Sequence, residues 1–70
     1  MSFLFTVEIE LETDGRWIAE VVELPGVLAY GSTQDEAIAL VQAHALRILA
    51  DRRESAEAAR ESLDISFSVT

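Results

Sequence analysis

The opening segment of the chain alternates apolar and polar side chains. The apolar side carries Phe3, Phe5, Val7, Ile9 and Leu11, and the polar side carries Thr6, Glu8, Glu10 and Glu12. A period of two is typical of a strand with one buried face. The pattern therefore predicts a strand from Phe3 to Glu12.

A hairpin is expected next, because Asp14 and Gly15 form a dipeptide that accepts the positive φ angles of a tight turn. The second strand is predicted from Arg16 to about Glu23. One of its faces carries Trp17, Ala19 and Val21, and the other carries Ile18, Glu20 and Val22. Trp17 is expected in the core, whereas the pattern leaves Tyr30 open between core and surface.

The stretch after the second strand contains the residues that end one element and begin the next. Pro25 donates no ladder hydrogen bond and Gly26 permits a sharp change of direction, so strand pairing is expected to stop there. A third, shorter strand follows over 27–30, and Gly31 then lets the chain turn. Thr33 and Glu36 fit a capping box at the start of a helix, in which the hydroxyl and the carboxylate bond the two backbone amides.

The helix is predicted to run to about Arg53. Its sheet-facing residues recur at three- and four-residue spacing and are Ile38, Val41, Ala45, Ile48 and Leu49. Leu40 and Leu46 lie off this stripe, so they either flank the core or contact another subunit, and we assign them to self-association. The segment 54–62 fits an extension of the helix, a separate helical turn or a flexible connection. Alternation over 63–70 predicts a final strand.

The length, the absence of cysteine and the net charge limit which classes of protein and partner fit the chain. The chain has 70 residues, no cysteine and a net charge of -8 at pH 7. One small α+β domain over 1–70 without disulfides usually needs another source of stability, so we expect a homo-oligomer. The negative field disfavours direct nucleic-acid binding and favours a basic partner. The sequence shows no signal peptide or membrane span, and we expect a cytoplasmic protein.

No residue is arranged for catalysis. His44 has no positioned partner, and helix capping accounts for Ser32 and Thr33. The carboxylates of Glu8, Glu10, Glu12 and Glu20 share one face, but i, i+2 neighbours on a strand lie about 7 Å apart and do not converge on an ion. We therefore predict neither an enzyme nor a metal or cofactor site. These four glutamates are the predicted partner-binding surface.

The run DGRWIAEVVELPGVLAYGSTQDEAI, over 14–38, resembles the HicB family of antitoxins. That family has an acidic strand, an Asp-Gly turn, an aromatic residue, a Leu-Pro-Gly turn, a Gly-[Asp/Ser/Thr]-Thr cap and a Glu-Ala helix start. The resemblance carries over to Pro25, Gly26, Gly31, Thr33 and Glu36 as residues that form the fold.

The resemblance implies a partial ribonuclease-H-like, β-β-β-α-β fold with an antiparallel sheet and one helix on one face, without the catalytic carboxylates. It also implies a type II antitoxin that covers the active surface of HicA, a small basic toxin that cleaves mRNA. The alternative is a solitary HicB-like interaction or regulatory protein without a toxin. Many HicB proteins continue into a DNA-binding module; this chain shows none, so autoregulation by DNA binding is not expected.

Overall fold

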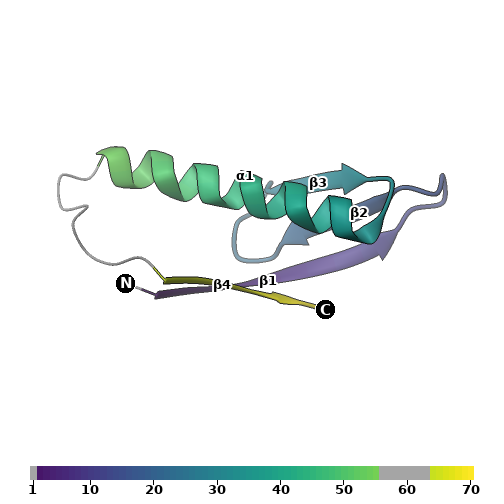
Figure 1. The fold of residues 1–70 in the computed structure, drawn as a ribbon, viewed down its shortest axis with the longest axis horizontal. Coiled ribbons are helices and arrows are strands. Elements are labelled where there is room, and N and C mark those ends of the chain that lie inside the picture. The colour runs from purple at the N-terminus through teal and green to yellow at the C-terminus, as the bar shows by residue number, and fades with distance from the viewer. Residues whose placement is uncertain (1, 56–63) are drawn as a thin grey trace.

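The computed structural model describes residues 2–55 and 64–70, which form four strands and one helix (Figure 1). The elements are β1 (Ser2–Leu11), β2 (Trp17–Val21), β3 (Leu28–Gly31), α1 (Gln34–Ser55) and β4 (Asp64–Val69). The predicted α+β class and element order are confirmed. Most boundaries differ from the predicted ones by one or two residues. Within the segment 54–62, the helix extends over 54 and 55; residues 56–62, and Leu63 of the predicted last strand, lie outside the described residues.

The sheet is mixed, with strand order β3-β2-β1-β4. β2 is antiparallel to both β1 and β3, but β4 is parallel to β1. The prediction of an antiparallel sheet is therefore wrong for β4. The reason is α1, whose 22 residues span about 33 Å and return the chain to the end of the sheet where β1 begins (Figure 1). Asp64 consequently lies opposite Ser2.

The two halves of β1 pair with different strands. Its first half pairs with β4, from Ser2 to Val7, and its second half pairs with β2, from Val7 to Leu11. Two aromatic contacts support the first half: Phe5 stacks on Phe3 with ring centroids 5.7 Å apart and meets Phe67 of β4 at 5.8 Å. Such pairs add to the stabilisation from burial.

The core lies between α1 and one face of the sheet. Its buried residues are Phe5, Val7, Ala19, Val21, Val27, Ala37, Val41, Ala45 and Leu49. The predicted helix face is confirmed at Val41, Ala45 and Leu49, while Ile38 and Ile48 are half-buried. Trp17 is half-buried and packs against the core, as expected. Tyr30 is 41% exposed, which settles the question left open by its pattern.

Two turns carry glycines with positive φ. Gly15, with φ 90°, donates its amide to the Glu12 carbonyl at 3.0 Å, and the Glu12 amide donates to the Arg16 carbonyl at 2.7 Å. The hairpin loop thus has three residues, and only its glycine needs a positive φ. In the second turn, the Val27 amide donates to the Leu24 carbonyl at 3.0 Å, with Pro25 and then Gly26 (φ 86°) between them, which is a type II turn.

Gly31 is needed for space and not for a turn conformation. A Cβ on this residue would lie 2.5 Å from the Ala37 amide nitrogen and 3.0 Å from the Thr33 carbonyl oxygen, and its φ is not positive. The last residue of β3 therefore packs directly against the first turn of α1. A side chain there would push the helix away from the sheet.

The predicted capping box forms in a modified way. The Glu36 amide donates to the Thr33 hydroxyl at 3.1 Å, as expected for a helix that begins after Thr33. The Glu36 carboxylate, however, accepts the amide of Ser32 at 3.1 Å and its hydroxyl at 3.3 Å. The carboxylate thus reaches one residue further back than the capping box predicts. Asp35 and Glu36 also place negative charge at the positive end of the helix dipole.

We expect Gly31→Ala to destabilise the protein by about 1–3 kcal/mol, because the added methyl group overpacks the contact between β3 and α1. Gly26→Ala should cost about 1–2 kcal/mol for a different reason, the left-handed conformation. Urea unfolding monitored by circular dichroism measures both. Gly26→Asn should recover part of the loss, since asparagine tolerates positive φ, whereas Gly31→Asn should not. A fully stable Gly31→Ala variant would show that α1 can shift freely.

Candidate functional site

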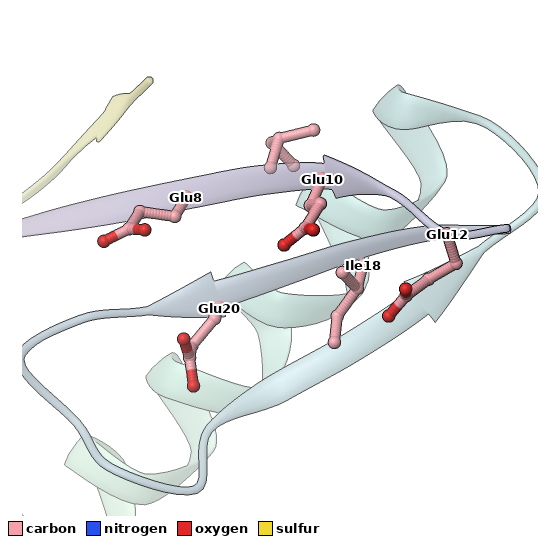
Figure 2. Close-up of a pocket in the computed structure, with 6 residues that line it drawn as sticks. Glu8, Glu10, Glu12, Ile18 and Glu20 are labelled. Atoms are coloured by element: carbon pink, nitrogen blue, oxygen red, sulfur yellow. The ribbon is translucent and has the colours of Figure 1, made fainter.

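Four carboxylates gather on the sheet face that α1 leaves uncovered. They belong to Glu8 and Glu10 of β1, Glu12 after it, and Glu20 of β2, and together with Ile9 and Ile18 they line an open groove, here called the acidic groove. Figure 2 shows the four carboxylates over the two strands, with the helix behind the sheet. The structure therefore brings together all four predicted partner-binding residues.

Strand alternation and register place these side chains. Val7 is buried against α1, so Glu8 and Glu10 on either side of Ile9 point to the opposite face. Across the hairpin, Glu20 lies directly opposite Glu8, and Ile18 lies opposite Glu10. The sequence indicated the shared face, but the cross-strand pairs depend on the three-residue loop.

The charges of the acidic groove are not compensated. Within the part of the chain that the structure describes, none of its four carboxylates has a hydrogen bond or an ion pair from a side chain. Like charges directly opposite each other on neighbouring strands are destabilising. The free protein therefore carries an unfavourable interaction between Glu8 and Glu20.

The acidic groove does not have the geometry of a metal site. Among residues 2–51 and 64–70, no three histidine or acidic side chains gather within reach of one ion. His44 is half-buried on α1, on the other side of the sheet. What the groove offers is a negative surface with an apolar floor at Ile18, which suits a cationic side chain and its aliphatic stem.

Apolar side chains extend the same face beyond the acidic groove. Leu28 lies beside Glu20, Tyr30 beside Ile18, and Leu4 precedes the acidic stretch of β1. Their exposed fractions are 37%, 41% and 68%. Exposed apolar residues next to a charged cluster are typical of protein-binding surfaces.

A fixed cation borders this face. The Arg16 guanidinium carbon lies 4.4 Å from the centre of the Tyr30 ring, and the Arg16 Nε donates to Asp14 at 2.8 Å. The Arg16 amide also donates to Asp14, at 3.1 Å. This backbone hydrogen bond, with the guanidinium adding to it, holds the pKa of the Asp14 carboxyl below its usual value.

Glu23 has a structural role that the sequence did not reveal. Its carboxylate accepts the Thr6 amide at 2.7 Å and the Thr6 hydroxyl at 2.9 Å. β2 ends at Val21, and the Val22 amide still donates to the Thr6 carbonyl at 3.0 Å. The Glu23 carboxylate therefore takes the place of a strand carbonyl as the acceptor of the Thr6 amide. The Thr6 amide is the main cause that lowers the pKa of the Glu23 carboxyl, and the hydroxyl adds to it. No local pattern links two residues this far apart in the sequence.

The two residues predicted for self-association are both exposed, Leu40 by 48% and Leu46 by 44%. Six residues of an α-helix turn through about 600°, so the two side chains lie about 120° apart around the axis of α1. They consequently belong to different sides of the helix. One flat helix contact would not cover both.

The chain matches no protein-family model, and no match is found among curated proteins or solved structures. Neither the HicB resemblance nor a ribonuclease-H-like fold is therefore supported by a relative. As to membranes, no helix within residues 2–55 and 64–70 has the length and apolar character of a span.

We expect Glu8→Gln to stabilise the free protein by about 0.2–1 kcal/mol, because it removes the like-charge pair with Glu20. Ala43→Lys, on the exposed side of α1, changes the net charge equally and is the control. Denaturant unfolding at low and high salt measures the difference between the two variants, which should shrink as salt screens the repulsion. Equal stabilities at low salt would mean that the pair carries no repulsion.

We expect Glu23→Gln to be less stable than the natural protein at neutral pH. A carboxyl whose pKa is lowered by folding stabilises the native state above its unfolded pKa, and that contribution is lost as the pH falls through the lowered value. The difference in thermal midpoint between the natural protein and Glu23→Gln should therefore become smaller as the pH falls below 4.5, the usual pKa of a glutamate carboxyl. Thr6→Val removes the hydroxyl donor but keeps the backbone amide, so its thermal midpoint shows how much of the effect comes from each of the two hydrogen bonds. A gap that stays constant into strong acid would contradict the assignment.

Proposed function

We propose that this protein is a HicB-like antitoxin that binds a small, basic, HicA-type ribonuclease and covers its active surface. Two independent lines support the proposal: the resemblance of 14–38 to HicB antitoxins, and the uncompensated acidic groove. The proposal includes the partial ribonuclease-H-like form of the fold and a cytoplasmic location. It assigns the chain no catalytic activity and no cofactor.

The observation that carries the proposal is the direct opposition of Glu8 and Glu20 on the sheet face that α1 leaves uncovered. This arrangement lowers the stability of the free chain. A cationic partner relieves the repulsion on binding, so the complex gains electrostatic free energy that the free protein lacks. Functional surfaces commonly keep residues that are unfavourable for folding.

Long-range attraction is the first step of the proposed mechanism. A chain with a net charge of -8 draws a basic protein toward it, and the acidic groove sets the orientation of the encounter. Lysine or arginine side chains of the toxin then enter the groove between Glu10 and Glu20. Leu28 and Tyr30 supply apolar contact beside it. The toxin residues that contact RNA become inaccessible.

The test is whether this protein associates with a HicA-type protein, which the proposal expects to be a small basic protein encoded by a neighbouring gene. We expect the double variant Glu8→Gln and Glu10→Gln to slow association by roughly three- to tenfold at low salt, because it weakens electrostatic steering. Its association rate should also depend less on salt. Stopped-flow or surface-plasmon measurements give both quantities, and co-expression reports whether the variant still protects cells from the toxin.

The matched control is Ala39→Lys with Ala43→Lys, which changes the net charge by the same amount on the exposed side of α1. It should retain most of the association rate. Equal slowing by both double variants would mean that total charge, and not the acidic groove, guides binding. Failure of the natural protein to bind or neutralise the neighbouring gene product would reject the antitoxin function and favour a solitary HicB-like interaction protein.

A further inference from the structure

The outer edge of β3 has backbone groups that no described strand pairs. In the β2–β3 ladder, the Val21 amide donates to the Val27 carbonyl at 3.0 Å, and alternation continues through Ala19 opposite Ala29. The amides and carbonyls of Leu28 and Tyr30 therefore point away from β2. No described strand lies beyond them, because β3 is the first strand in the sheet order.

Natural proteins usually protect such an edge with charged residues, proline or a bulge. β3 contains no charged residue, proline or bulge, since its sequence is LAYG, although the chain as a whole is strongly charged. Its length of four residues is the protective feature that this edge does have. Leu28 and Tyr30 are also both exposed on the open face. The edge is thus short, uncharged and apolar.

We propose that β3 pairs antiparallel with β3 of a second copy of this chain, so that the two sheets form one continuous eight-stranded sheet. With the two-fold axis at Ala29, Leu28 lies opposite Tyr30 of the second copy. The pairing forms four backbone hydrogen bonds and places an aromatic ring beside a leucine twice. The small Ala29 side chains meet on the helix-bearing face and add no steric obstacle there.

Local charge complementarity favours a second copy as the occupant, although two chains that each carry a net charge of -8 repel each other at long range. Arg16 lies over the Tyr30 ring, and Glu20 is the neighbour of Leu28 in the next strand. In the paired sheet, Glu20 lies two strands, or about 10 Å, from Tyr30 of the second copy. The backbone of Arg16 of the second copy lies one strand further, so this ion pair forms in the proposed dimer when both side chains extend toward each other over the Tyr30 ring. The two-fold axis forms this ion pair twice.

β4 is the other edge of the sheet and the rival site for self-association. It begins with Asp64, and no described arginine is placed beside it as Arg16 is beside β3. The two edges make different predictions for backbone amides. Pairing through β3 protects Leu28 and Tyr30, whereas pairing through β4 protects Ile65, Phe67 and Val69, whose amides point away from β1.

The experiment combines sedimentation equilibrium with amide hydrogen exchange of the natural protein over a range of concentrations. We expect a dimer in which Leu28 and Tyr30 exchange as slowly as Ala29 and lose this protection on dilution. Ala29 is the internal control, because it bonds to β2 in monomer and dimer alike. A chain that stays monomeric, or a dimer with fast exchange at Leu28 and Tyr30, would overturn the proposal.

Two variants test the contacts. Leu28→Pro removes an outward amide without breaking the β2 ladder and should abolish the dimer while leaving the circular dichroism spectrum unchanged. Glu20→Arg places like charges near Arg16 of the second copy. It should raise the dissociation constant by roughly five- to thirtyfold, since each exposed ion pair changes affinity by a few-fold and two form per dimer.

Addition of Arg16→Glu to Glu20→Arg reverses both charges and should restore the dimer. If the double variant is folded and remains monomeric, the ion pair does not form. Neither measurement involves a toxin, so a failure of this proposal leaves the proposed antitoxin function untouched, and the reverse also holds.

Discussion

The contact between Gly31 and the first turn of α1 sets the arrangement of the whole molecule. With no side chain at Gly31, the helix backbone approaches the end of β3 so closely that a Cβ would lie 2.5 Å from the Ala37 amide. The helix consequently begins directly over β2 and β3 and buries Val41 and Ala45 against them. None of the described residues covers the opposite face of the sheet, and its side chains must suit water or a partner.

This one-sided cover explains why the open face combines charge with exposed apolar groups. Glu8, Glu10 and Glu20 keep the face hydrated, but the direct opposition of Glu8 and Glu20 is less favourable than a neutral pair would be. The core is small, so a penalty of even a fraction of a kcal/mol matters to a chain of this length. Solubility alone would be served as well by carboxylates spread over the surface. Their concentration in one groove is the feature that points to recognition of a cationic surface.

Alternation and turn residues were sufficient to predict the strands, the helix and the shared face of the four glutamates. Three features needed the structure. The parallel pairing of β4 follows from the path of α1, which returns the chain to the start of β1, and the alternation over 63–70 carries no signal of strand direction. The bond between Glu23 and Thr6 joins residues 17 positions apart without any periodic signal. The role of Gly31 is a matter of interatomic distance, which a sequence does not contain.

The acidic groove lies on the same sheet face as the exposed side chains of Leu28 and Tyr30 on β3. Binding of a cationic partner and pairing through β3 are therefore linked by geometry. A continuous sheet would place the grooves of the two copies on one side, separated by the β3 strands. Glu20 would then pair with Arg16 of the second copy and leave Glu8 without its like-charged neighbour nearby, which lowers the repulsion within each groove. Self-association would thus reduce the negative charge at one end of the groove and keep Glu10 and Glu12 free. The two interactions compete for the carboxylate of Glu20, so an ion pair across the dimer reduces the contribution that this residue makes to the binding of a cationic partner.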